Sequence, residues 1–166
     1  MRHLKKEVIF MGLIVKDLKS GHMGIDWNSK NHKEIFLRGP DSAGGIGFQC
    51  SYMYTGEKTI KYISFFLIPY NSVNDIVTDD HTGESEKGGR VTGFLKPNTW
   101  GHCTFEAIWY NSTITQLKMT KSVLEFDDGT SETITADQIQ FTSTEEEMIE
   151  LGKKAIGKIK GFFNKK

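Results

Sequence analysis

Cysteine is scarce in this chain of 166 residues, and its net charge is zero. The two cysteines, Cys50 and Cys103, are too few for a disulfide-dense scaffold or a four-thiolate zinc site. Lysine and arginine together number 21, as do aspartate and glutamate, so no general attraction to nucleic acid is expected. No stretch reaches the roughly 18 apolar residues that a membrane-spanning helix needs.

Proline is also scarce, with 3 residues against 17 glycines, so turns are expected to rely on glycine, asparagine and aspartate. Hydrophobic residues make up 37% of the chain and charged residues 25%, which is ordinary for a soluble globular protein. The length suits one domain with a substantial core and is short for two.

Residues 1–21 imitate a signal peptide without completing one. Their start is basic, but Glu7 interrupts the apolar part, which ends at Lys16 with no small-residue cleavage site after it. We therefore expect a cytoplasmic protein, and the sequence does not decide between Met1 and Met11 as its start. In that compartment both cysteines are expected to be free, buried thiols, with one bridge between strands as the alternative.

Two long stretches, residues 58–75 and 105–129, are rich in aromatic and β-branched side chains, which predicts interior strands of antiparallel sheets. In the first, apolar residues occupy both parities, which predicts a central strand covered on both faces. In the second, the apolar parity changes, so a bulge is expected near Thr120. These patterns predict four core residues: Phe66, Trp109, Leu117 and Val123.

Shorter elements surround these two stretches. Residues 33–38 predict one strand, residues 39–47 a flexible glycine-rich connection, and residues 79–89 the most exposed loop. Together with a hairpin turn at residues 127–129, the chain shows about seven strands, the number typical of an immunoglobulin-like antiparallel β-sandwich. We take that sandwich as the expected fold class.

Three segments of the chain resemble, in the same order, segments of a known group of domains: YISFFLIPYNSVNDIV, GFLKP and FEAIWYNSTITQLKMTKSVLEFDDGTSETI. The group is that of bacterial immunoglobulin-like domains of unknown function, and the similarity covers about residues 58–135. The resemblance implies a sandwich that forms a non-enzymatic part of a bacterial protein, and it brings no catalytic residue to transfer. The matching residues are Pro69, Tyr70, Asn71, Gly93, Pro97, Trp109, Tyr110 and Asn111.

The C-terminal segment predicts an amphipathic helix over residues 144–163. Thr144 and Glu147 form a capping signal, glutamates lead and lysines follow, and the apolar residues share one face. That face is expected to dock on its own sandwich, on a second copy or another protein, or on a membrane surface with its lysines toward the head groups. The candidate contact residues are Ile156, Ile159, Phe162, Phe163, Lys154 and Lys158.

The chain is thus expected to comprise an N-terminal arm and loop (1–32), a sandwich domain (33–141) and the helix (144–163). No catalytic, metal or cofactor site is predicted. The five histidines have no ligand spacing, and residues 79–89 lack the pattern of a calcium loop. His102 and Cys103 are adjacent and would point to opposite faces of a strand, although a pairing of Cys50 with His102 stays open.

The expected function is that of a non-catalytic binding or adaptor module with a protein partner, either a second copy or another chain. Its small-molecule ligand, if one exists, is unknown, and nucleic acid is not expected. Trp27 and Trp100, placed in loops, are the candidate ligand-contacting aromatics. The alternatives are a peripheral membrane protein that uses the lysine-rich helix and, third, an enzyme of unknown class.

Overall fold

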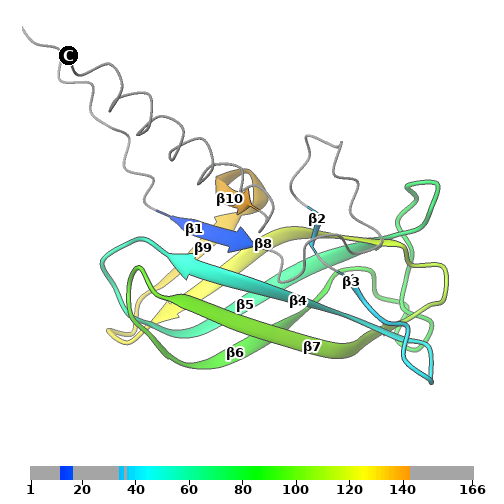
Figure 1. Ribbon diagram of the computed structural model, residues 1–166, viewed down its shortest axis with the longest axis horizontal. Coiled ribbons are helices and arrows are strands. Elements are labelled where there is room, and N and C mark those ends of the chain that lie inside the picture. The colour runs from blue at the N-terminus through cyan, green and yellow to red at the C-terminus, as the bar shows by residue number, and fades with distance from the viewer. Residues whose placement is uncertain (1–11, 17–33, 36, 143–166) are drawn as a thin grey trace, which may run out of the picture.

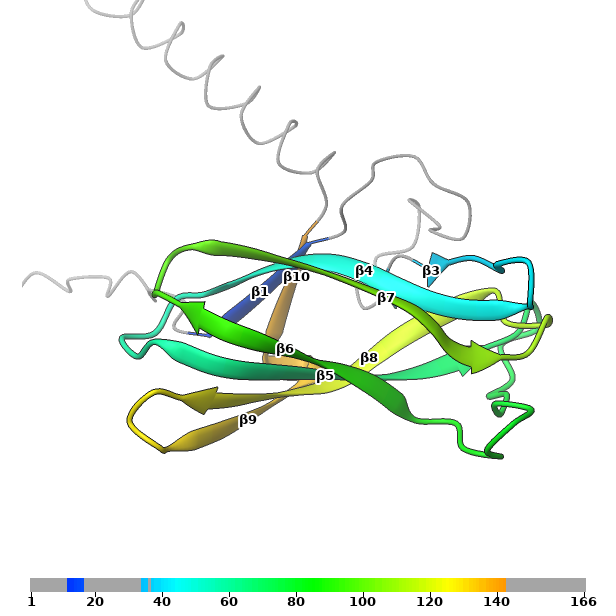
Figure 2. The same ribbon diagram turned by 90° about the horizontal axis from the view of Figure 1, so that it is seen from below.

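A computed structural model of the chain describes residues 12–16, 34–35 and 37–142 (Figure 1). This part is mainly β, with ten strands and one short 3-10 helix arranged in two sheets. Figure 2 shows the sheets as two layers, an arrangement consistent with the expected β-sandwich. The predicted helix, residues 144–163, lies outside the described residues, as do residues 1–11 and 17–33.

The first sheet is centred on β4, which is bonded on one side to β7 and on the other to β1 and β3. β1 in turn pairs in parallel with β10, while the other pairs in this sheet are antiparallel. The strands of this sheet are β1 (Leu13–Lys16), β3 (Leu37–Arg38), β4 (Gly45–Tyr54), β7 (Trp100–Tyr110) and β10 (Ile139–Thr142).

In the second sheet β5 lies between β6 and β8, so the prediction of a central strand here is confirmed. β8 pairs on its far side with β9 and β2. The 3-10 helix η1 (Ala136–Gln138) carries the chain from β9 to β10 in the first sheet. The strands of the second sheet are β2 (Glu34–Ile35), β5 (Ile60–Tyr70), β6 (Lys87–Leu95), β8 (Gln116–Phe126) and β9 (Ser131–Thr135).

Residues 33–38 do not form the single strand that their composition predicts. The chain forms β2 against β8 in the second sheet and β3 against β4 in the first, so it passes from one layer to the other within a few residues. Apolar periodicity reports that side chains are buried, but it does not report which sheet receives them.

The predicted glycine-rich connection is wrong over its last part, because β4 begins at Gly45. An added Cβ at Gly47 would lie 1.8 Å from the carbonyl oxygen of Phe105 on β7. The register between β4 and β7 shifts at this point, so the glycine is required by the close approach of two backbones. Its role is contact between strands and not chain flexibility.

The predicted bulge near Thr120 is confirmed. Phe66 pairs with Lys121 and Leu67 with Met119, so Thr120 is the extra residue on β8. The core predictions are confirmed for Trp109 and Leu117, which are fully buried, and wrong for Phe66 and Val123, which are only half-buried. Beyond the bulge the inward positions of β8 belong to Ser122, Leu124 and Phe126.

Candidate functional site

Among the candidate contact residues, only Trp100 lies in the described part of the chain. It is the first residue of β7 and not a loop residue, and it is half-buried. The Lys16 ammonium lies 4.3 Å from the centroid of its ring, so this aromatic face already has a cation on it. Trp27 and the helix candidates Ile156, Ile159, Phe162, Phe163, Lys154 and Lys158 lie outside the described residues.

The structure pairs His102 with Ser51 and not with Cys50. His102 Nδ1 and Ser51 Oγ are 2.6 Å apart on neighbouring strands, a distance typical of a nucleophile and its base. The Ser51 side chain is fully buried, so a substrate carbon has no access to its hydroxyl. The pair therefore serves as a cross-strand hydrogen bond in this conformation.

Cys50 instead faces Cys103. The two residues are direct cross-strand partners, and their Sγ atoms lie 3.4 Å apart. Both are buried free thiols, as expected. The hydrogen bond from Cys103, together with burial, raises the pKa of Cys50 well above its ordinary value, so this thiol is not an activated nucleophile.

The loop at residues 79–89 is not wholly solvated, because the Asp79 carboxylate is only 1% exposed. Asp79 Oδ1 accepts the Tyr110 N–H at 2.7 Å, and Oδ2 accepts the Lys87 ammonium at 2.6 Å and the Thr82 hydroxyl at 2.7 Å. Burial alone would raise the pKa of Asp79, but these hydrogen bonds outweigh it and hold the pKa well below the usual range. Asp79 thus anchors this loop to β6 and β7.

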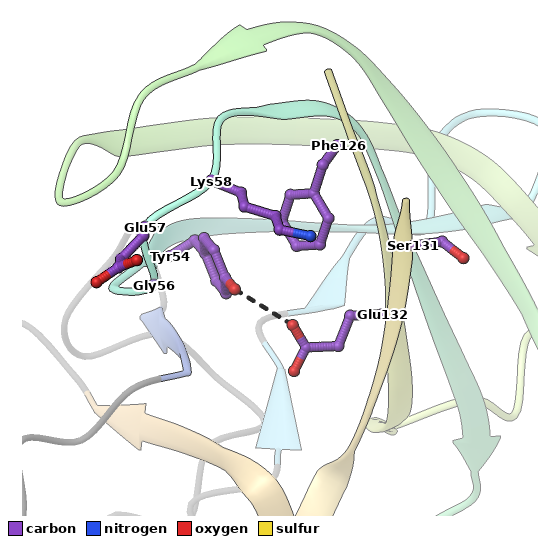
Figure 3. Close-up of a pocket in the computed structure, with 7 residues that line it drawn as sticks. All are labelled: Tyr54, Gly56, Glu57, Lys58, Phe126, Ser131 and Glu132. Atoms are coloured by element: carbon purple, nitrogen blue, oxygen red, sulfur yellow. Dashed lines mark hydrogen bonds between the residues drawn. The ribbon is translucent and has the colours of Figure 1, made fainter. Parts of the chain in front are cut away.

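A pocket of about 430 Å³ opens at one end of the sandwich, between the β4–β5 turn and the β8–β9 hairpin (Figure 3). Its apolar part consists of the Tyr54 and Phe126 rings, whose centroids are 5.3 Å apart. Polar groups surround these rings: the Tyr54 hydroxyl donates to Glu132 at 3.2 Å, and Lys58 extends beside Phe126.

Several polar groups at this pocket already have partners within the protein. Lys58 donates to Thr130 Oγ1 at 2.7 Å and lies 3.1 Å from an Asp128 carboxylate oxygen. Hydrogen bonds from Thr130 and Lys58 lower the pKa of Asp128 to about 2. Burial and the nearby Glu132 raise the pKa of Tyr54, so its hydroxyl stays protonated and bound to that carboxylate. Three of the polar side chains that line this pocket, Tyr54, Lys58 and Glu132, are thus engaged within the protein.

The outer edge of β6 is more open. Among the described strands β6 pairs only with β5, which leaves one side of a nine-residue strand without a ladder partner. Such an edge presents a row of backbone donors and acceptors that a further strand can bind. No proline interrupts it, and Gly88 and Gly89 place no side chain over it.

Both cationic residues of β6 are turned away from this edge. Arg90 lies across β5, with its guanidinium 3.9 Å from the centre of the Tyr62 ring and 2.8 Å from Glu125 on β8. Lys87 reaches toward the other sheet, to Asp79 and to the carbonyl of Ile108. Charged side chains that would guard an edge strand are therefore committed elsewhere.

The other long edge strand, β7, is protected by an irregularity. Its ladder with β4 shifts between Phe105 and Trp109, and Ala107 in the shifted part has a φ of 54°. A bulge of this kind twists an edge and limits pairing with a new strand. On the second sheet β9 has only five residues, so it offers a shorter edge than β6.

An exposed aromatic residue marks the end of the β6 edge. Opposite Lys61 the ladder with β5 contains two residues, Gly93 and Phe94, and the Phe94 side chain is 73% exposed. Gly93 has a φ of 138°, a conformation that favours glycine. The exposed Phe94 ring therefore lies beside the open edge of β6.

The sequence predicted an exposed loop up to residue 89, although β6 begins at Lys87, and it did not indicate a free strand edge here. Edge position depends on strand order, which no local pattern encodes; the glycines at 88, 89 and 93 were the available signal of an unusual strand.

Within the described residues, no group of three or more His, Cys, Asp or Glu side chains is placed to hold a metal ion. The same residues include no helix with the length and hydropathy to cross a bilayer. Comparison of the chain with family models, curated proteins and solved structures finds no match in any of the three.

Proposed function

We propose that this protein is a cytoplasmic, non-catalytic binding module, built on an immunoglobulin-like sandwich, that holds an extended segment of a partner protein along β6. The observation that supports it is the edge of β6, which has no ladder partner among the described strands and whose two cations, Arg90 and Lys87, are held by contacts within the protein. In this proposal the segment at residues 144–163 acts separately, as the docking or oligomerisation element its sequence predicts.

Backbone hydrogen bonds would supply the affinity. A strand of nine residues spans about 30 Å, and a partner chain laid beside it satisfies its outward N–H and C=O groups. One side chain would supply selectivity: Phe94 is the apolar anchor at one end of this edge.

A different protein suits this edge better than a second copy. Antiparallel pairing of two β6 strands about a two-fold axis at Arg90 would set two arginines opposite each other, and like charges so placed destabilise a sheet. The partner in this proposal is an extended segment of another chain, with an apolar residue near the end that meets Phe94.

The test uses a phage-displayed library of random linear peptides, selected on the full-length chain. Hydrogen exchange is then measured for the chain with and without the best synthetic peptide. We expect binding to slow exchange at backbone amides of residues 88–92. We expect Phe94→Ala to weaken binding about tenfold, because burial of a phenylalanine contributes about 1.5–3 kcal/mol.

Val73→Ala is the matched control, because Val73 is 70% exposed but lies in the loop before β6. It should leave the affinity unchanged. The proposal is overturned if no peptide is selected, if exchange slows at the pocket of Tyr54 and Glu132 and not along β6, or if the two variants weaken binding equally.

A further inference from the structure

The two cysteines of the chain occupy one pair of facing positions in the first sheet. Cys50 on β4 and Cys103 on β7 are Cα partners in the antiparallel ladder, with Sγ atoms 3.4 Å apart. They lie between the pair Phe48 and Phe105 on one side and the pair Tyr52 and Gly101 on the other. Two residues that are 53 positions apart in sequence are therefore brought within reach of one covalent bond.

The geometry of this pair is close to that of a disulfide. Directly opposed residues in an antiparallel ladder have Cβ atoms about 4.5–5.5 Å apart. A disulfide needs Cβ atoms about 3.5–4.5 Å apart and sulfurs about 2.05 Å apart. Small rotations of the two side chains and a slight approach of β7 to β4 satisfy both conditions, and β7 is an edge strand whose far side has no ladder partner among the described strands.

We propose that Cys50 and Cys103 are a redox modification site, at which an oxidised low-molecular-weight thiol converts the two thiols into a disulfide joining β7 to β4. This inference does not rest on the β6 edge. It specifies a covalent state of the protein that depends on the thiol–disulfide balance of its surroundings.

The order of the two exchange steps follows from the solvent exposure of the two thiols. Cys103 is 7% exposed and Cys50 is fully buried, so Cys103 meets the oxidant first. The Cys103 thiolate attacks the small disulfide and releases one of its halves as a thiol. Cys50 then loses its proton and attacks the mixed disulfide at the Cys103 sulfur, which releases the second half. Two protein thiols are oxidised and one small disulfide is reduced to two thiols, so atoms and electrons balance.

The raised pKa of Cys50 bears on the rate and not on the outcome. The Cys103 hydrogen bond and burial keep Cys50 protonated near neutral pH, which slows its attack on the mixed disulfide. Once formed, the bond closes a loop that contains β5 and β6, and it restricts the unfolded chain accordingly.

The experiment incubates the full-length reduced chain in equal millimolar amounts of reduced and oxidised glutathione. The chain is then denatured in acid, its free thiols are alkylated, and its intact mass is measured. We expect roughly nine-tenths or more of the chains to carry no alkyl group, no glutathione, and two hydrogen atoms fewer. Oxidation should also raise the midpoint of thermal unfolding by about 5–10 °C.

Cys103→Ser and Cys50→Ser are the controls, and neither should show a redox-dependent midpoint. The thiol count on the unmodified chain decides the matter even if a serine variant does not fold. The proposal is overturned if both thiols stay free in this buffer, if each takes up glutathione without closing the bridge, or if the cross-link joins two chains.

Discussion

The carboxylate of Asp79 offers a sharp test of how the loop before β6 is held. Asp79→Asn preserves the shape of the side chain but removes its charge, and an amide cannot accept the same set of four hydrogen bonds. The Lys87 ammonium, whose side chain is 16% exposed, would lose its charged partner and keep only the Ile108 carbonyl. Removing one partner of a buried ion pair lowers the free energy of unfolding by about 3–5 kcal/mol. Because Lys87 retains some solvent, we expect about 3 kcal/mol.

The assay is equilibrium denaturation by urea of the parent, Asp79→Asn, Lys87→Met and the double variant. The double-mutant cycle should give a coupling free energy of about 1–3 kcal/mol, since the two groups touch. Lys58→Met is the matched control, because Lys58 pairs with Asp128 at an exposed site and the loss of this pair should lower the free energy of unfolding clearly less than the loss of the Asp79–Lys87 pair.

The same residue predicts a dependence on pH. Because the pKa of Asp79 is lowered in the folded state, its stabilising effect is complete above the ordinary carboxyl pKa and is lost as the pH falls through the folded-state value. The difference between parent and Asp79→Asn should thus shrink below about pH 4. A difference under about 1 kcal/mol at pH 7, or one that stays constant down to about pH 2, would refute this account of the anchor.

Three further predictions concern the core. Trp109→Ala should lower the free energy of unfolding by about 3–5 kcal/mol, because the ring is fully buried and its Nε1 donates to the Ser85 carbonyl; a loss below about 1 kcal/mol in urea would contradict the assignment. Leu67→Ala should lower the free energy of unfolding by about 2–5 kcal/mol and Phe66→Ala clearly less, because only Leu67 faces the core. If thermal melts show equal destabilisation by both variants, the bulge is assigned to the wrong position. Iodoacetamide should modify Cys50 and Cys103 of the folded reduced chain far more slowly than in urea, as followed by mass, and rapid modification of either thiol near neutral pH would indicate an activated thiolate.

The long strands were predictable because their signals are local. Apolar residues on both parities of residues 58–70 indicated a central strand covered on both faces. β5 is central, but only one of its faces is buried, because residues such as Phe66 on the other face are half-buried. The change of parity around Thr120 indicated a bulge, and the ladder has one there. Periodicity of this kind needs only neighbouring residues to be interpreted.

Which residues of β8 face the core beyond the bulge was not predictable in the same way. Parity placed Val123 with Leu117 in the core, but the structure buries Ser122, whose hydroxyl donates to the Ser64 carbonyl at 2.9 Å. A polar side chain can occupy an inward position when a backbone acceptor meets it there. That acceptor comes from β5, more than fifty residues away, so hydrophobicity along β8 could not reveal it.

The candidate surface depends on distant contacts even more strongly. Whether β6 is an edge follows from the strand order of the whole sheet, and whether its edge is guarded follows from where Arg90 and Lys87 point. In the sequence Phe94 is not distinguished from other apolar strand residues. In the structure it lies in the bulge with Gly93, and its side chain is exposed. The sequence therefore predicted the long strands, whereas the exposed edge of β6 follows from how the strands are ordered in the sheet.

The parallel pairing of β1 with β10 has a mechanical consequence. Leu13 lies beside Ile139 and Lys16 beside Thr142, so the chain enters β1 at one end of the pair and leaves β10 at the other. Tension applied through residue 12 and residue 142 would pull the two strands lengthwise past each other. The interstrand bonds of the pair would then share the load and have to break together, whereas a hairpin pulled from one end opens one bond at a time. The join between the first and last described strands is thus arranged to resist stretching.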